Sequence, residues 1–204
     1  MIVVGLCGGS GSGKGCVGAV FENNGFPAID TDEVYHRLVS SDSECLRELA
    51  LAFGESIVRD GALNRRALAD IVFSGDSSAE KLKTLNEISH KHVLCEARKM
   101  IEDYSSSGKR MVVVDAPLLF ESGFDKECDV TVAVVADREV RIKRIMDRDN
   151  ITYPEAERRI AAQRTDDWLR ENADKIVENN SDTAALRCEV SGLIKDILNE
   201  FGEK

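Results

Sequence analysis

The chain has 204 residues, of which 43% are hydrophobic and 31% charged, and its formal net charge is −10 at pH 7. These values exclude a disordered chain and a membrane protein, and the length is enough for one globular domain with insertions. The negative charge argues against nucleic acid as a partner. The six cysteines are scattered and form no C-x-x-C pair, and the N-terminus shows no signal-peptide pattern. Together these features predict a cytoplasmic protein with reduced thiols.

Short apolar runs alternate with longer helical patterns along the chain. Five runs are predicted to form strands: 1–7 (MIVVGLC), 26–30 (FPAID), 110–115 (RMVVVD), 129–135 (DVTVAVV) and the weaker 175–179 (KIVEN). Near-continuous apolar runs are typical of strands buried on both faces of a parallel sheet. Amphipathic patterns over 136–149 and 182–201 predict two of the helices that cover it. The expected fold class is therefore α/β, with a parallel five-stranded sheet flanked by helices.

Two segments interrupt this alternation. Residues 33–105 carry helical patterns and at most one short strand, at 55–58 (ESIV), so they are predicted to form a helical insertion. Residues 138–164 are helical and basic, with eight Arg or Lys against five acids, which favours a site that gathers anions. The core is then expected to combine residues 1–32, 106–137 and 165–204.

A glycine-rich loop follows the first run. In GGSGSGKGC (8–16), Gly8, Gly13 and Lys14 have the spacing of the phosphate-binding pattern G-x-x-x-x-G-K, with a strand before it and a helix after it. Glycines allow backbone N–H groups to turn toward phosphates, the helix N-terminus adds partial positive charge, and the lysine reaches the outer phosphates. A dinucleotide G-x-G-x-x-G fingerprint that begins at Gly13 starts five residues too late for that motif. A purely structural glycine turn is the other alternative.

The loop lacks the hydroxyl that usually follows the lysine and holds Mg²⁺, because Gly15 stands there. The stretch GSGKG is similar to the loop of the adenylate kinase family, which also has glycine at this place. That resemblance implies that Mg²⁺ is held by nucleotide phosphates, water and carboxylates, in line with its use of few protein ligands. The loop therefore predicts a small-molecule kinase that uses ATP.

Six further stretches, in order along nearly the whole chain, resemble the dephospho-coenzyme A kinase family. They are IDTD (29–32), DGALNRRAL (60–68), LNEISH (85–90), DAPLLFESG (115–123), RIMDRDNIT with RIAAQ (144–152 and 159–163), and ADKIVENN (173–180). The chain departs from the family pattern at Gly15-Cys16, where Ser-Thr is usual, at Lys91, where proline is common, and at Arg164, where methionine is frequent.

The resemblance implies phosphorylation of the ribose 3′-hydroxyl of dephospho-coenzyme A by ATP, with Mg²⁺ as cofactor, in the last step of coenzyme A biosynthesis. It also implies a P-loop NTPase core, in which residues 33–105 bind the acceptor and residues 138–164 form a lid over ATP. The expected partners are these small molecules, with neither nucleic acid nor membrane among them.

The same resemblance, together with residue chemistry, assigns individual roles. Lys14, Asp32 and Arg148 are predicted to be catalytic, with Asp32 as the general base or as the carboxylate that orients the hydroxyl. Asp32 and Asp115 are candidate Mg²⁺ groups, directly or through water. ATP is expected to contact Gly9, Ser10, Gly11, Ser12, Gly13, Lys14, Gly15, Cys16, Arg144 and Arg148, and the acceptor to contact Asp32, Arg65, His90, Leu118 and Glu121.

These roles have plainer alternatives. Asp32 also suits a helix N-cap, Asp115 a turn acid, His90 a core or capping histidine, and the lid arginines a solvated basic face. For the whole chain, the alternatives are a nucleotide or nucleoside kinase and a regulatory nucleotide-binding protein without catalysis. The latter has no use for both Asp32 and a basic lid, which disfavours it.

Overall fold

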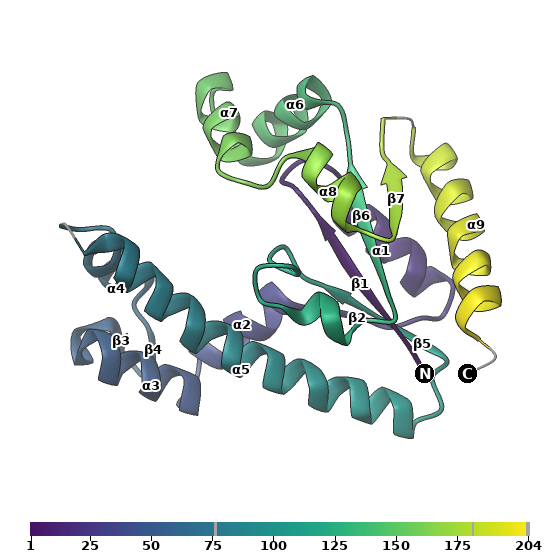
Figure 1. The fold of residues 1–204 in the computed structure, drawn as a ribbon. Coiled ribbons are helices and arrows are strands. Elements are labelled where there is room, and N and C mark those ends of the chain that lie inside the picture. The colour runs from purple at the N-terminus through teal and green to yellow at the C-terminus, as the bar shows by residue number, and fades with distance from the viewer. Residues whose placement is uncertain (76, 181, 203–204) are drawn as a thin grey trace. The chain divides into compact units, whose positions relative to one another are not determined.

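The computed structural model describes residues 1–75, 77–180 and 182–202 (Figure 1). The chain divides into two compact units, one formed by Met1–Ile29 with Ile101–Lys204 and the other by Asp30–Met100. Within the described ranges, no helix combines the length and the apolar character needed to cross a bilayer.

The first unit is built on a five-stranded parallel sheet with the strand order β2-β5-β1-β6-β7. These strands are β1 (Ile2–Gly8), β2 (Ala28–Asp30), β5 (Met111–Asp115), β6 (Val130–Val135) and β7 (Lys175–Glu178). The central strand β1 places Leu6 beside Asp115 of β5 and Gly8 beside Val134 of β6. All five strands predicted from apolar runs are confirmed, and so is the α/β class. The carboxyl ends of β1, β5 and β6 meet at one edge, where open α/β sheets bind ligands.

Both faces of this sheet are covered, which explains its continuous apolar runs. Every residue of β5 and β6 is buried. On one face, α1 (Lys14–Asn23) packs against α9 (Thr183–Phe201), and both lie on the same side of the strands in Figure 1. There Val4 and Val132 join Phe21 of α1 and Val190 of α9 in one core. The other face carries η2 (Phe124–Glu127) and α8 (Asp166–Asn172).

Two helices follow β6, namely the basic α6 (Arg138–Asp149) and α7 (Tyr153–Ala161), in which acids and arginines balance. Asn150 ends α6 in the left-handed conformation, with φ of 52°, which asparagine tolerates better than most residues. Thr152 and Glu155 then form a capping box that starts α7. Ile145 and Ala156 pack between the two helices, so the pair has a small apolar core of its own.

The second unit contains α2 (Thr31–Val39), α3 (Glu44–Phe53), η1 (Glu55–Ile57), β3 (Val58–Arg59), β4 (Ala62–Leu63), α4 (Arg65–Val72) and most of α5 (Ser78–Ser106). Its helices share a core around Leu49, Ile57 and Leu68. The strand expected over 55–58 is wrong for most of its length, because only Val58 belongs to a strand. Asp60 and Gly61, with φ of 53° and 76°, instead form the tight turn of the β3–β4 hairpin.

Candidate active site

The glycine loop joins β1 to α1 at the carboxyl edge of the sheet. Gly11 and Gly13 have φ of 78° and 90°, and a Cβ on Gly13 would overlap the amide of Asn179. Among the described residues, no side chain caps the N-terminus of α1, whereas Asp30 caps α2 and Asp182 caps α9. The uncapped N–H groups and the positive end of the helix dipole therefore suit an anion.

Side chains from distant elements hold the carbonyl groups of this loop. Nε of Arg141, a residue only 3% exposed, donates to the Ser10 carbonyl at 3.0 Å. Nδ2 of Asn179 donates to the Ser12 carbonyl at 2.7 Å, and Nη1 of Arg144 approaches the same oxygen at 3.4 Å. The predicted ATP residue Arg144 thus lies on the loop. These side chains engage the loop carbonyls and so help to hold the loop in shape.

Arg141 also connects the loop to the segment after α7 and to α8. Its Nη1 donates to Asp166 of α8 at 2.7 Å and its Nη2 donates to Oε1 of Gln163 at 3.2 Å. The same Gln163 oxygen accepts from the Ser10 N–H at 2.8 Å. The spacing of Arg141 with Arg144 and Arg148 marks one face of a basic helix, but it does not predict that Arg141 is buried against the loop. Residue pattern alone does not single out Gln163 or Asn179 for this site, although they stand in RIAAQ and ADKIVENN. Their roles depend on contacts far apart in the chain.

Lys14 and Asp115 form an ion pair at the mouth of the loop. Lys14 begins α1, Asp115 ends β5, and their side chains are only 17% and 13% exposed. Cys7 lies at the end of β1, and burial raises the pKa of its thiol to about 12, although Lys14 opposes this shift. Cys7 is therefore a neutral thiol at physiological pH and does not act as a nucleophile.

The first turn of α1 is open around Gly15. A Cβ built there has no neighbour within 4 Å among the described residues, and both Gly15 and Cys16 are exposed. In contrast, Ser12 is fully buried, and its hydroxyl has no hydrogen-bond partner within the described part of the chain. Position 15, which carries a hydroxyl side chain in most P-loops, therefore has no side chain in this protein, but it is exposed and has room for one.

A magnesium site built only from protein groups is absent from the described residues, which contain no cluster of three or more His, Cys, Asp or Glu side chains that could hold a metal. Asp115 nevertheless places one carboxylate beside the loop lysine. One or two carboxylates are what Mg²⁺ uses when phosphates and water supply its other ligands. The residues present therefore fit an ion that arrives with a nucleotide.

Arg148 of α6 reaches the loop but has a counter-ion there. Its Nε and Nη2 donate to the two carboxylate oxygens of Asp149 at 2.7 and 2.8 Å, and Nη2 lies 3.5 Å from the Ser10 hydroxyl. Hydrogen bonding to Arg148, together with the charge of Arg159, lowers the pKa of Asp149 to about 2. A phosphate would therefore have to replace an ionised carboxylate on Arg148.

In the second unit, Asp30 and not Asp32 is the N-cap of α2. Oδ1 of Asp30 accepts from the N–H groups of Asp32 at 2.9 Å and Glu33 at 3.1 Å, so the capping alternative for Asp32 is wrong. Asp32 and Arg65 line one cavity of about 580 Å³, while His90 is half-buried elsewhere on α5. The cavity wall is otherwise largely apolar and includes Leu63, Leu68, Val72, Phe73 and Leu85.

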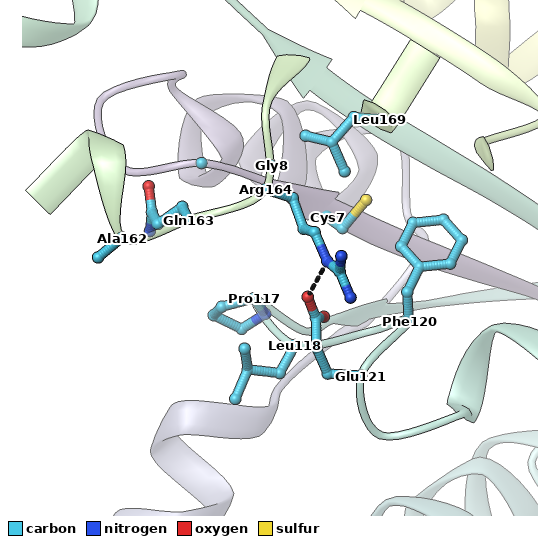
Figure 2. Close-up of a pocket in the computed structure, with 11 residues that line it drawn as sticks. Cys7, Gly8, Pro117, Leu118, Phe120, Glu121, Ala162, Gln163, Arg164 and Leu169 are labelled. Atoms are coloured by element: carbon cyan, nitrogen blue, oxygen red, sulfur yellow. Dashed lines mark hydrogen bonds and ion pairs between the residues drawn. The ribbon is translucent and has the colours of Figure 1, made fainter. Parts of the chain in front are cut away.

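The predicted acceptor residues Leu118 and Glu121 lie in the first unit, beside the loop. They line a second cavity, of about 360 Å³, with Gly8 and Gly9 (Figure 2). Arg164 lines it too, and its Nε donates to Oε1 of Glu121 at 3.0 Å. The structure thus places one candidate acceptor wall directly next to the phosphate loop.

Comparison with known proteins identifies the relatives of this chain. The family model of dephospho-CoA kinase matches residues 2–185. The chain belongs to the dephospho-CoA kinase family. A dephospho-CoA kinase of Corynebacterium glutamicum is 37% identical over 200 residues, which cover 98% of both chains. One of Moorella thermoacetica is 38% identical over 205 residues, which cover 100% of this chain and 95% of the relative.

Solved structures share the fold of this chain. A crystal structure of a Thermus thermophilus protein is 32% identical, with a TM-score of 0.77 and coverage of 98% of this chain and 97% of that chain. Shikimate kinase from Acinetobacter baumannii, at 17% identity and a TM-score of 0.57, covers 98% of this chain and 95% of its own and shares the fold. The family resemblance and the P-loop kinase fold are confirmed, and the dinucleotide alternative for the glycine loop is wrong.

Proposed function

We propose that this chain transfers the γ-phosphoryl group of ATP to the ribose 3′-hydroxyl of dephospho-coenzyme A, forming coenzyme A and ADP in the last step of coenzyme A biosynthesis. The observation that carries this proposal is membership of the dephospho-CoA kinase family across residues 2–185, in a chain whose loop lysine faces a strand-end carboxylate. The free cysteines support a cytoplasmic location.

The phosphate loop binds ATP through the N–H groups of residues 9–16 and through Lys14. Lys14 is kept beside the loop by Asp115 and donates to the outer phosphates. Arg148 exchanges Asp149 for phosphate oxygens, and its planar guanidinium engages two of them at once. Since one anion replaces another, this exchange leaves the charge of the arginine neutralised. Arg144 stays on the loop carbonyls, where its charge still attracts the nucleotide.

Asp32 acts as the general base. The 3′-hydroxyl oxygen attacks the γ-phosphorus, and the hydroxyl proton passes to the Asp32 carboxylate. The bond between the γ-phosphorus and the β,γ-bridging oxygen breaks, and its electron pair leaves with ADP. Two observations support this role: Asp30 already caps α2, and Asp32 lines the same cavity as Arg65.

Asp115 would hold Mg²⁺ at the loop, with Asp32 as a second group acting directly or through water. When bound, Mg²⁺ neutralises part of the charge on the β- and γ-phosphates. Gly15 offers no hydroxyl to a bound ion, so phosphate and water would have to supply more of its ligands than in a loop with serine at this position.

The segments have separate tasks. Residues 33–105 bind the acceptor, with Arg65 and His90 near its polar groups. Residues 138–164 form the lid, which excludes water from the transferred phosphoryl group. Residues 1–32, 106–137 and 165–204 form the nucleotide-binding core. Leu118 and Glu121 of this core supply an apolar surface and a polar contact for the acceptor.

The test is ADP release from ATP and Mg²⁺ with dephospho-coenzyme A, AMP, UMP or adenosine as acceptor, and mass spectrometry of the product. We expect turnover on dephospho-coenzyme A, with a product heavier by one phosphoryl group. Lys14→Ala and Asp32→Asn should abolish it. Turnover on AMP or UMP in its place would establish a nucleotide kinase, and ATP binding without turnover on any acceptor would establish a nucleotide-binding protein.

A further inference from the structure

We propose that Arg164 determines acceptor specificity by binding the diphosphate group of dephospho-coenzyme A, exchanging Glu121 for phosphate oxygens. This inference rests on the proposed function, because it assumes that the second cavity receives the acceptor. Arginine presents five hydrogen-bond donors to an anion.

The neighbouring Gln163 brings Arg164 to the phosphate loop. Oε1 of Gln163 accepts from the Ser10 N–H at 2.8 Å and from the buried Arg141 at 3.2 Å. The backbone that follows α7 is therefore tied to the loop one residue before Arg164. As a result, Arg164 lines the 360 Å³ cavity together with the loop glycines Gly8 and Gly9.

The guanidinium of Arg164 is held on two sides. Its Nε donates to Glu121 at 3.0 Å, and its Cζ lies 4.5 Å from the ring centroid of Trp168. Phe120 braces that ring in an edge-to-face contact, with centroids 5.1 Å apart. Figure 2 shows Arg164 and Glu121 pointing toward each other from the lid end and from the segment after β5. This cation–π contact fixes the guanidinium before a ligand arrives.

The contact with Glu121 occupies only one of the three guanidinium nitrogens. Among the residues that the structure describes, Nη1 and Nη2 of Arg164 have no hydrogen-bond partner. The pair is also accessible, with the Arg164 side chain 53% and the Glu121 side chain 31% exposed. Exposed ion pairs with a single hydrogen bond contribute little to stability, whereas two parallel bonds from a guanidinium to phosphate are strong. A phosphate can therefore displace Glu121.

The diphosphate of the acceptor is the anion that fits this place. Lys14, which we assign to the outer ATP phosphates, does not line this cavity, and of the residues assigned to ATP only Gly9 lines it. The wall opposite Arg164 comes from Pro117, Leu118, Phe120 and Glu121, which we assign to the acceptor. Dephospho-coenzyme A carries a diphosphate next to its reacting ribose, and adenosine carries none. A cation at this wall thus selects the acceptor by its phosphates.

Steady-state kinetics of Arg164→Met test the proposal, with Arg164→Lys as the conservative variant. Arg158→Met is the matched control, because Arg158 is an exposed arginine of the same lid that does not line the cavity. We expect Arg164→Met to raise the KM for dephospho-coenzyme A about tenfold, with kcat and the KM for ATP unchanged within about twofold. Arg164→Lys should give a rise of about threefold, because it keeps the charge without the fork. Arg158→Met should match the wild type.

Adenosine, used as an inhibitor competitive with dephospho-coenzyme A, separates phosphate recognition from loss of the whole acceptor site. Its inhibition constant should be the same in Arg164→Met and wild type. An unchanged KM for dephospho-coenzyme A, a rise confined to the KM for ATP, or an equal loss of adenosine binding would overturn the proposal. If the wild type itself does not phosphorylate dephospho-coenzyme A, the proposed function fails, which is a distinct result.

Discussion

Arg141→Met removes the charged group that holds the phosphate loop to Gln163 and to α8. Arg141 is 3% exposed and donates to the Ser10 carbonyl at 3.0 Å, to Gln163 at 3.2 Å and to Asp166 at 2.7 Å. Methionine keeps an unbranched apolar stem of similar width. The substitution therefore reports mainly on the three hydrogen bonds and not on packing.

The expected loss follows from those bonds. Each bond to a neutral oxygen contributes about 0.5–1.5 kcal/mol, and the bond to the carboxylate about 1.5–3 kcal/mol, which sums to about 2.5–6 kcal/mol. The variant also avoids the desolvation cost of burying the guanidinium charge, which offsets part of this sum. We therefore expect the free energy of unfolding to fall by about 2–4 kcal/mol. For a chain of this size, about 2–4 °C per kcal/mol converts this to a Tm lower by about 4–16 °C.

Urea unfolding followed by circular dichroism measures this loss of stability, and calorimetric titration with ATP measures the affinity of the loop for ATP. The loop should bind ATP more weakly in Arg141→Met, because Ser10 loses its anchor. Arg138→Met is the matched control: Arg138 begins the same helix but its side chain is 54% exposed and pairs with Glu157 on the surface. A stability loss below about 1 kcal/mol for Arg141→Met, or one equal to that of Arg138→Met, would refute the reasoning.

Three further outcomes are expected. A Cβ at Gly15 would meet no neighbour within 4 Å among the described residues, so Gly15→Ser should fold normally and lower the Mg²⁺ concentration for half-maximal activity; a Mg²⁺ titration that matches the wild type contradicts this. Lys14→Ala should reduce kcat by at least about 100-fold while far-UV circular dichroism stays native, since it removes a cation that stabilises the transferred phosphoryl group; retention of a tenth of the activity would exclude that role. Burial raises the pKa of Cys7 from 9.0 to about 12, so the unfolded thiol ionises first and stability falls as pH rises between these values. The slope for this one thiol is about 1.4 kcal/mol per pH unit, and Cys7→Ala should flatten the alkaline limb of a urea-unfolding series by that amount; identical slopes would count against it.

The strands could be predicted because burial on both faces leaves a direct trace in composition. Val112 to Val114 and Val132 to Val135 are continuous apolar runs, and each lies in a fully buried strand. The short β3–β4 hairpin has its signal in Asp60-Gly61, a pair typical of tight hairpin turns. In the sequence that pair attracts attention only as part of DGALNRRAL, and the hairpin is missed.

The site could be predicted only where local spacing encodes it. The loop from Gly8 to Lys14 depends on glycines close together in the chain, and its geometry follows from that spacing. The side chains that hold the loop carbonyls from other parts of the chain do not follow from local spacing. Arg141 lies 131 residues from Ser10, and Asn179 lies 167 residues from Ser12, so no local pattern reports these contacts. Residue type also fails to identify the N-cap of α2, because Asp30 and Asp32 are equally suited to cap a helix and only the structure shows that Asp30 does so.

The bond between Asn179 and Ser12 also bears on how the chain becomes competent during synthesis. At roughly 5–20 residues per second, the 167 residues between them take roughly 8–33 s to be made. During that interval the glycine loop has emerged, while the amide that supports it has not yet been made. A nascent chain released before β7 would therefore carry the whole glycine motif without a formed nucleotide site. Retention on immobilised ATP should consequently report that translation has passed Asn179.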